Sequence, residues 1–234
     1  MTGGGRLVAI IPCYNPGPAV VDVIRQTREQ VDALLVVDDG SDAATVERLG
    51  GTGAACLRFS GNRGKGHALL AGLSRWLTDP TWTAVVLLDA DGQHDPGEIA
   101  TLRRAWETGL GDVVIGARTG DWTAVAGRRR WANRVSSHVL SRLCGQALID
   151  SQSGFRLLAR PVVERVLPSL AGGRYETESV LLLRAARAGF RIASVPVRLI
   201  LPQGAIPSHF RAIRDSLRVA GALARHAMPW ARLR

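Results

Sequence analysis

Cysteine is scarce in this sequence. Cys13, Cys56 and Cys144 stand far apart among 234 residues and form no CxxC pair. This spacing argues against a zinc site or a disulfide framework and indicates a reducing compartment such as the cytosol. No apolar run reaches the roughly 20 residues of a membrane-spanning helix, and the short glycine-rich start lacks the features of a signal peptide. We therefore expect a cytoplasmic protein without a membrane span.

Acidic residues are fewer than basic residues in this sequence. Lysine and arginine total 30 against 20 aspartates and glutamates, which gives a net charge of +10, most of it from arginine. Such a balance favours anionic partners: nucleic acid, an acidic membrane surface or phosphorylated substrates. Hydrophobic residues make up 46% of the chain, enough for a substantial core. The length fits one large domain better than two.

Apolar stretches that suit strands alternate with stretches of helical spacing in the first half of the chain. This alternation predicts an α/β fold with a mainly parallel central sheet and helices on both faces. The expected strands are 6–11, 33–37, 56–59, 85–88, 112–116 and, in the second half, 191–199. The expected helices are 19–30, a short one after Asp42, 67–77, 96–108, 128–143, 175–188 and 210–228.

Polar side chains gather where four of these strands end. The strand ends carry Tyr14–Asn15, Asp38–Asp39, Asn62–Gly66 and Asp89–Asp91. In open α/β sheets, ligands bind outside the carboxyl ends of the strands, so four polar ends at one rim predict a nucleotide–metal site. Asp89 and Asp91 point to the same side of an extended chain and repel unless a cation lies between them. One or two carboxylates plus substrate phosphates suit Mg²⁺ or Mn²⁺.

Other interpretations of these residues stay open from the pattern alone. Asp89 to His94 could be a polar turn that caps the helix after Pro96. The Gly64–Lys65–Gly66 loop is not a Walker motif, because glycine rather than serine or threonine follows the lysine, which disfavours a P-loop kinase. A sugar nucleotidyltransferase would carry a glycine-rich loop after the first strand. A nucleic-acid-binding module would explain the charge but not the paired aspartates.

Taken in order, the motifs resemble those of family-2 glycosyltransferases with the GT-A fold, and most of all the dolichyl/polyprenyl-phosphate sugar (mannose or glucose) synthase branch. The matching motifs are Ile11–Asn15, Val36–Ser41, Asn62–Gly66, Asp89–His94 and Ser153–Arg156. The resemblance covers roughly residues 6–210 and implies a nucleotide-sugar donor, a divalent cation and inversion at the anomeric carbon. Two departures stand out: Pro16 replaces the usual glutamate, and the C-terminal membrane spans common in this branch are missing.

The resemblance assigns roles on the donor side. Asp91 is the expected direct metal ligand, Asp89 contacts the ribose or the metal, and Gln93 completes the metal shell. Asp39 is the expected partner of the base or ribose, and Lys65 is expected to reach a phosphate or the ribose. Apart from the resemblance, Asp38 is expected to cap the turn, because one of two adjacent aspartates often does only that. The full nucleotide-binding set is Pro12, Tyr14, Asn15, Asp39, Lys65, Asp89, Ala90 and Asp91.

On the acceptor side, arginine predominates. Arg118 follows the fifth expected strand, and Arg128 to Arg130 open a helix, where an anion binds well and arginine suits bidentate phosphate contact. The expected catalytic residues are Asp89, Asp91, Arg118 and Arg129, and the expected acceptor-binding residues are Arg118, Arg129, Asn133, Asp150 and Arg156. For a hydroxyl acceptor, Asp150 and Glu178 are the candidate bases. His209 or Arg211 could reach the diphosphate.

The leading hypothesis is transfer of a hexose from a GDP-mannose or UDP-glucose class donor to a polyprenyl or dolichyl phosphate at the cytosolic membrane face. The alternative is the same donor chemistry with a soluble or polysaccharide hydroxyl acceptor. We expect one GT-A domain, with residues 6–120 binding nucleotide, 121–210 serving the acceptor and 211–234 forming a basic amphipathic helix. That helix would lie on an anionic membrane or dock on the core. We further expect contact with a membrane or a membrane-protein partner, and no nucleic-acid partner.

Overall fold

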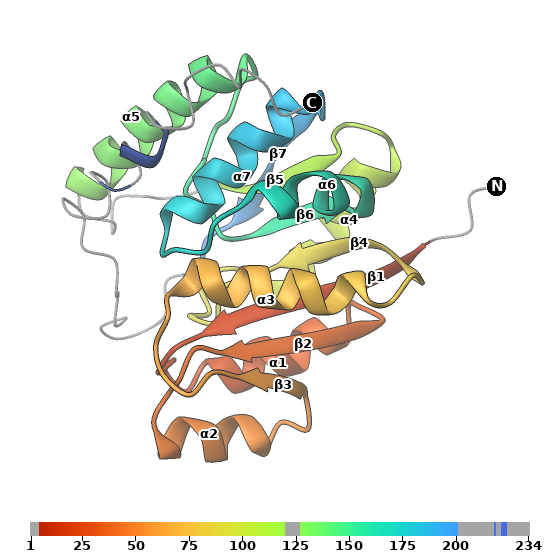
Figure 1. The fold of residues 1–234 in the computed structure, drawn as a ribbon, viewed down its shortest axis with the longest axis vertical. Helices are drawn as coiled ribbons and strands as arrows, with labels where there is room; N and C mark the ends of the chain where they lie inside the picture. Colours follow the sequence, from red (N-terminus) through yellow and green to blue (C-terminus); the bar gives the residue numbers. More distant parts are fainter. Residues whose placement is uncertain (1–4, 120–126, 201–217, 219–220, 224–234) are drawn as a thin grey trace.

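A computed structural model describes residues 5–119, 127–200, 218 and 221–223 of the chain (Figure 1). Strands and helices alternate as the sequence predicts. The elements are β1 (Arg6–Cys13), α1 (Val20–Arg28), β2 (Ala33–Asp38), α2 (Ala43–Gly50), β3 (Ala55–Arg58), α3 (Lys65–Leu77), β4 (Trp82–Leu87), η1 (Pro96–Glu98), α4 (Ile99–Glu107), β5 (Val113–Thr119), α5 (Gly127–Cys144), β6 (Arg156–Ala159), α6 (Arg160–Val166), η3 (Leu167–Ser169), α7 (Glu176–Arg187) and β7 (Ile192–Arg198).

The seven strands form one mixed sheet in the order β3-β2-β1-β4-β6-β5-β7. The first four are mutually parallel, and β5 pairs in parallel with β7. Strand β6 runs antiparallel between β4 and β5. The mainly parallel sheet expected from the sequence is confirmed, with one reversed strand, β6, between β4 and β5.

Helices cover both faces of the sheet, also as expected (Figure 1). Leu73 of α3, Val162 of α6 and Leu182 of α7 belong to one hydrophobic core cluster. Ile24 of α1 and Leu102 of α4 belong to a second cluster, built on the alternate side chains of the same strands. Because successive side chains of a strand point to opposite faces, a strand buried on both faces is a continuous apolar run, as β4 is.

Three details differ from the sequence prediction. Strand β6 was not predicted, because four buried residues show neither alternation nor the length of a typical strand. Strand β5 extends beyond residue 116, so Arg118 lies within the strand and not after it. The helix expected from Pro96 begins as a 3-10 turn, and α4 proper starts at Ile99.

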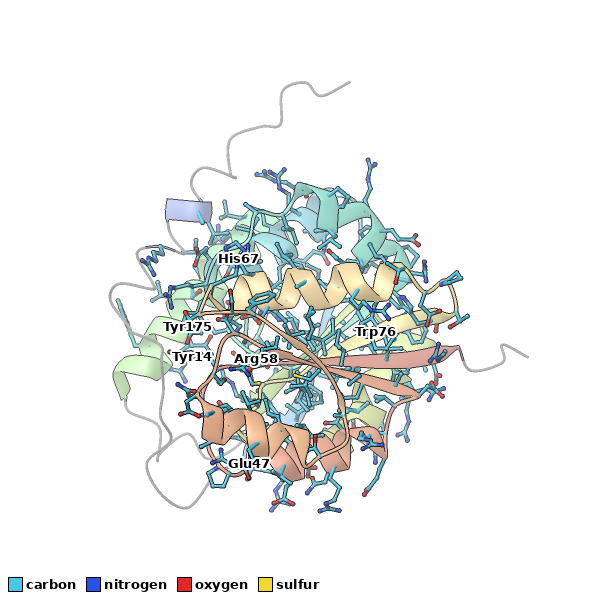
Figure 2. All side chains as sticks on the ribbon, turned by 60° about the horizontal axis from the view of Figure 1, so that its bottom comes forward. Tyr14, Glu47, Arg58, His67, Trp76 and Tyr175 are labelled. Carbon is cyan, nitrogen blue, oxygen red and sulfur yellow. The ribbon has the colours of Figure 1, made fainter. Side chains whose placement is uncertain are left out.

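The carboxyl ends of the parallel strands and the beginning of α3 share one rim of the molecule, on the left in Figure 1. Figure 2 shows the same polarity along α3: His67 lies at the rim, near the labelled Tyr14 and Tyr175, and Trp76 lies at the opposite end. The predicted functional motifs therefore converge on one side of the sheet, as the parallel topology requires.

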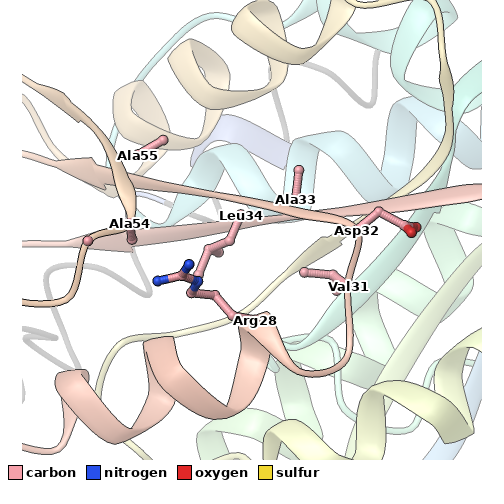
Figure 3. A pocket seen from close by; sticks show the side chains of 8 residues that line it. Arg28, Val31, Asp32, Ala33, Leu34, Ala54 and Ala55 are labelled. Carbon is pink, nitrogen blue, oxygen red and sulfur yellow. The ribbon is translucent and has the colours of Figure 1, made fainter.

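A separate hollow of about 280 Å³ lies at the other end, where β2 and β3 begin (Figure 3). Its lining includes Arg28 and Asp32, whose polar atoms are already engaged. Arg28 donates to the Thr52 carbonyl at 3.0 Å, and Asp32 accepts from the Leu7 amide at 2.7 Å. These contacts join the ends of neighbouring helices and strands. They supply hydrogen-bond partners for the charged side chains that line this hollow.

Most of the predicted helix 210–228 lies outside the described residues. Its described turn contains Ala222 and Leu223, both buried, and Leu223 packs in the same core cluster as Leu140 of α5. For this turn, docking on the core is confirmed. Within the part of the chain that the structure describes, no helix combines the length and apolar character needed to traverse a bilayer.

Candidate active site

The loop that leaves β4 carries the two predicted metal carboxylates. The strand ends at Leu87, and the side chain of Asp89 lies at the rim, about a quarter exposed. Gly154, from the loop before β6, backs directly against this carboxylate: a Cβ at Gly154 would overlap the Asp89 oxygens. Only glycine permits this approach, which explains why the Ser153–Gly154–Phe155 segment can lie beside the Asp89 loop.

Lys65 is the only lysine of the sequence, and its ammonium bridges two carboxylates. Its Nζ lies 2.6 Å from Asp89 Oδ1 and 3.0 Å from Glu178 Oε2. Burial alone would lower the pKa of Lys65, but the charges of Asp89 and Glu178 raise it above its ordinary value. Burial likewise acts to raise the pKa of Asp89, and the charge and hydrogen bond of Lys65 lower it. Both groups are therefore charged at neutral pH.

The pKa of Asp91 is shifted in the opposite direction to that of Asp89. Burial, and then the neighbouring charge of Asp89, raise the pKa of Asp91 to about 6. Its Oδ1 accepts a hydrogen bond from the Gln93 amide at 3.0 Å. The Gln93 carbonyl accepts from the Ile200 amide at 2.9 Å, which anchors this loop against the chain after β7. A carboxylate with a raised pKa beside a second carboxylate is a site whose repulsion a divalent cation relieves.

The two carboxylates fit a hard cation that takes further ligands from its substrate. Among the residues that the structure describes, no group of three or more His, Cys, Asp or Glu side chains is placed to hold a metal ion. Such a donor set suits Mg²⁺ or Mn²⁺, which complete their shells with diphosphate oxygens and water. Nearby His94 is buried against Phe155, with ring centroids 5.3 Å apart, and burial lowers the pKa of His94 to about 4. It is therefore a neutral packing residue of the motif.

On the nucleotide side, Asp39 holds a loop in place. Its carboxylate accepts from the Arg63 amide at 2.7 Å, the Gly64 amide at 2.8 Å and the Asn62 side chain at 3.0 Å. Asp38 accepts from the Ser41 amide at 3.0 Å, which confirms the turn-capping role expected for it. The end of β2 thus fixes the loop that begins α3 and carries Lys65.

The remaining predicted nucleotide contacts lie at the same rim. Asn15 has φ 43° and links two strand ends, donating its amide to Ser41 Oγ at 2.8 Å and accepting from the Asp42 amide at 2.9 Å. Tyr14 is half-buried beside it, whereas Pro12 and Ala90 are buried. The structure brings all of these residues and Lys65 to the ends of β1, β2 and β4 and the start of α3.

On the acceptor side, Arg118 and Asp150 form a bidentate pair. Arg118 Nε lies 2.7 Å from Asp150 Oδ2, and its Nη2 lies 2.9 Å from Oδ1. Asn133 of α5 donates to the same Oδ1 at 3.0 Å. Burial acts to raise the pKa of Asp150, but the hydrogen bonds and charge of Arg118 lower it. A carboxylate held in this way is a poor general base, contrary to the role considered for a hydroxyl acceptor.

Two serines that the sequence did not single out extend this network. Ser137, one helical turn after Asn133, donates to Ser151 Oγ at 3.1 Å and accepts from the Ser151 amide at 2.9 Å. Arg129 lies one turn before Asn133 in α5, and its side chain, like those of Arg128 and Arg130, is outside the described part. His209 and Arg211 also lie outside the described residues.

Arg156 departs from its prediction as an acceptor-binding residue. It has no exposed surface, and its guanidinium donates to the carbonyls of Ser153 at 2.8 Å, Glu178 at 2.9 Å and Ser151 at 2.8 Å. The prediction rested on the resemblance, in which Ser153–Arg156 matches the acceptor-side motif. Here the guanidinium donates to the carbonyls of an irregular loop beneath the site. The prediction that Arg156 contacts an acceptor directly is therefore wrong.

We predict that Arg156→Met lowers the free energy of unfolding by about 3 kcal/mol. Hydrogen bonds to a charged group are worth about 1.5–3 kcal/mol each, and the substitution leaves three carbonyls without their donor. Thermal unfolding should show a fall of roughly 6–12 °C. The control, Arg104→Met on the exposed side of α4, should change the melting temperature by less than about 2 °C. Equal effects from the two substitutions would contradict a structural role for Arg156.

Comparisons with known proteins agree with this geometry. The family model described as glycosyl transferase family 2 matches residues 8–167. Polyprenol monophosphomannose synthase of Mycolicibacterium smegmatis is 30% identical over 205 residues, which cover 82% of this chain and 76% of that protein. The UDP-N-acetylglucosamine–dolichyl-phosphate N-acetylglucosaminyltransferase of Methanococcus voltae is 26% identical over 212 residues, covering 82% of this chain and 84% of that protein.

A solved structure shares the fold. Glucosyl-3-phosphoglycerate synthase from Mycobacterium tuberculosis, in complex with Mn²⁺, UDP and phosphoglyceric acid, superposes with a TM-score of 0.73 at 23% identity, covering 96% of this chain and 79% of that one. The expected GT-A fold is confirmed, and so is the resemblance to the polyprenyl-phosphate sugar synthase branch. The chain belongs to glycosyl transferase family 2.

Proposed function

We propose that this enzyme is an inverting, metal-dependent hexosyltransferase that moves a sugar from a nucleotide donor to a polyprenyl or dolichyl phosphate at the cytosolic membrane face. The observation that carries the proposal is that the rim holds two chemically different groups of side chains. Two carboxylates and a lysine lie after the end of β4 and at the start of α3. Arg118 lies on β5, paired with Asp150, and the sequence of α5 opens with three more arginines. The first group suits a cation-bound diphosphate, and the second suits a phosphate acceptor.

On the donor side, Asp89 and Asp91 would hold the divalent cation, with Gln93 at its edge. The raised pKa of Asp91 supports this assignment, because a cation would remove the repulsion from Asp89 that causes part of the shift. When bound, the cation supplies charge neutralisation for the leaving diphosphate. The nucleoside would lie over Pro12, Tyr14, Asn15 and Asp39, with Lys65 close to the diphosphate or ribose.

On the acceptor side, the proposed phosphate contacts are Arg118 and Arg129. Asp150, which also accepts from Asn133, orients Arg118. Asp150 fixes the plane of the Arg118 guanidinium through two hydrogen bonds, which lowers the entropy lost on binding an anion. A phosphate oxygen is already a nucleophile, so attack on the anomeric carbon needs no general base. This agrees with a site where the candidate bases, Asp150 and Glu178, are paired with cations.

We also propose that the chain works as one GT-A domain, with residues 6–120 binding the nucleotide, residues 121–210 serving the acceptor and residues 211–234 forming a basic C-terminal segment. Relatives named for polyprenol and dolichyl-phosphate substrates support a lipid-linked acceptor. A chain that meets such an acceptor does so at a membrane surface, directly or through a membrane-protein partner.

A second candidate function has a specific observation in its favour. Solved structures of the same fold include glucosyl-3-phosphoglycerate synthase in complex with phosphoglyceric acid. The arginines proposed for the lipid phosphate, Arg118 and Arg129, would also suit the phosphate of a soluble acceptor. The hydroxyl of that acceptor would then need a base. The paired state of Asp150 and Glu178 makes this alternative the weaker one.

The test is a transfer assay with the full chain and Mn²⁺. GDP-mannose, UDP-glucose and UDP-N-acetylglucosamine are each combined with a polyprenyl phosphate in detergent, with 3-phosphoglycerate or with no acceptor, and products are identified by mass spectrometry. We expect a glycosyl-phospho-polyprenol with one of the donors and no product without a divalent cation. Transfer to 3-phosphoglycerate alone would establish the soluble alternative. Full transfer in the presence of EDTA would remove the proposed cation.

A further inference from the structure

The outer side of α5 exposes large apolar side chains in a row. Trp131, Val135 and Val139 are 69%, 42% and 44% exposed, and their spacing of four residues places them along one stripe of the helix. Ile149, in the loop that follows, is 62% exposed. Four of the seven exposed large hydrophobic side chains in the described part of the chain thus belong to α5 and its following loop. Such clustering, unlike single exposed residues, marks an interaction surface.

The same face is cationic. Arg134, His138 and Arg142 are exposed and alternate along the helix with the apolar stripe. The helix contains no acidic residue, and it opens with the Arg128–Arg130 triplet. A stripe of tryptophan and valine between arginines is typical of a helix that lies in the interface of an anionic bilayer, where tryptophan sits at the level of the headgroups.

The opposite side of α5 faces a group that we call the acceptor cluster, made of Arg118, Asn133 and Asp150. Asn133 and Ser137 are buried there, and Asn133 donates to Asp150, the partner of Arg118. The stripe and the cluster therefore lie on opposite sides of one helix, roughly 10 Å across with its side chains. Exposed Ile149 directly precedes Asp150 in the chain. A surface that touched the stripe would therefore lie about one helix diameter from the place where an acceptor phosphate is proposed to bind.

We infer that this α5 surface, made of Trp131, Arg134, Val135, His138, Val139, Arg142 and Ile149, docks on an anionic lipid bilayer and holds the acceptor cluster at the headgroup level. The inference deepens the proposed function and rests on its lipid-phosphate acceptor. A second copy of the chain fits the surface less well. A two-fold contact presents the same patch from both copies, and here it would bring arginines against arginines with no carboxylate from α5 to pair them.

The test is co-sedimentation of the full chain with vesicles of phosphatidylcholine alone and of phosphatidylcholine with phosphatidylglycerol. The unmodified chain should bind the anionic vesicles and should be released by 0.5 M NaCl (about a 4 Å Debye length). The variant Trp131→Ser/Val135→Ser/Val139→Ser should bind at least tenfold more weakly. The matched control Val21→Ser/Leu110→Ser, which removes exposed apolar side chains elsewhere, should bind like the unmodified chain.

Equal binding by the triple variant and the unmodified chain, or no binding by the unmodified chain, would overturn the inference. So would light scattering that shows a dimer converted to a monomer by the triple substitution, because the face would then join two copies. Transfer to polyprenyl phosphate in detergent separates this inference from the proposed function. If detergent transfer is normal and vesicle binding fails, only the α5 surface is wrong; if detergent transfer is absent, the proposed acceptor is wrong whatever the vesicles show.

Discussion

Asp91→Ala should lower turnover by on the order of a thousandfold or more while the chain stays folded. A cation ligand contributes charge stabilisation that is worth several kcal/mol in the transition state. Burial and the charge of Asp89 raise the pKa of Asp91, so its ionised form opposes folding when no cation is bound. Removing it should therefore raise the melting temperature of the metal-free chain by a few degrees, at about 2–4 °C per kcal/mol. Loss of activity with a gain of stability is the signature of a functional carboxylate.

Two further variants make this result specific. Asp91→Asn keeps an oxygen that accepts from the Gln93 amide and removes only the charge, so it should be as inactive as Asp91→Ala. Asp95→Asn, four residues on, keeps the cap on the Gly97 amide and should retain activity. Added Mn²⁺ should raise the melting temperature of the unmodified chain and of Asp95→Asn. It should leave the melting temperatures of both Asp91 variants unchanged. Normal turnover by Asp91→Asn would remove this carboxylate from the mechanism.

Lys65→Met should be the most destabilising substitution at the rim, with a loss of about 3 kcal/mol. It leaves Asp89 and Glu178 facing each other without their shared cation, and removal of one partner of a buried ion pair costs about 3–5 kcal/mol. We take the low end because the side chains of Lys65 and Asp89 are 19% and 26% exposed. Chemical denaturation at neutral pH measures this loss. Transfer should also fall, because Lys65 is a proposed donor contact.

A double-mutant cycle separates the ion pair from the loss of the lysine side chain itself. Glu178→Gln removes one of the two repelling carboxylates, so the double variant Lys65→Met/Glu178→Gln should recover more than about 1 kcal/mol relative to additivity. Mn²⁺ should stabilise Lys65→Met more than the unmodified chain, since a divalent cation can replace the missing charge beside Asp89. Arg103→Met, which breaks the exposed pair with Glu107, serves as the control and should cost less than about 0.5 kcal/mol. Additive effects of the two substitutions would show that Glu178 does not act through Lys65.

The local pattern of the sequence determined the first half of the fold. Continuous apolar runs such as 85–88 are buried on both sides of a parallel sheet, and alternation with helices forces the strands to be parallel, since each crossover returns the chain to the same end. Parallel strands then bring their carboxyl ends to one rim. That rule alone predicts that Asn15, Asp39, Lys65 and Asp89 lie near one another.

The tertiary structure decided what each of these residues touches. Four buried residues make β6, a strand too short to leave a pattern, which lies between β4 and β5 in the sheet. The charge of Arg118 on β5 still acts on Asp89 and Asp91 in the loop after β4. The place of β6 in the sheet turns Arg156 inward onto backbone carbonyls. Contacts across long stretches of sequence, such as Lys65 with Glu178 or Arg118 with Asp150, leave no periodic trace, because charge pairing depends on distance in space and not on spacing in the chain. Sequence therefore determined which residues reach the rim, and packing alone determined which of them bind each other and which are left to meet a ligand.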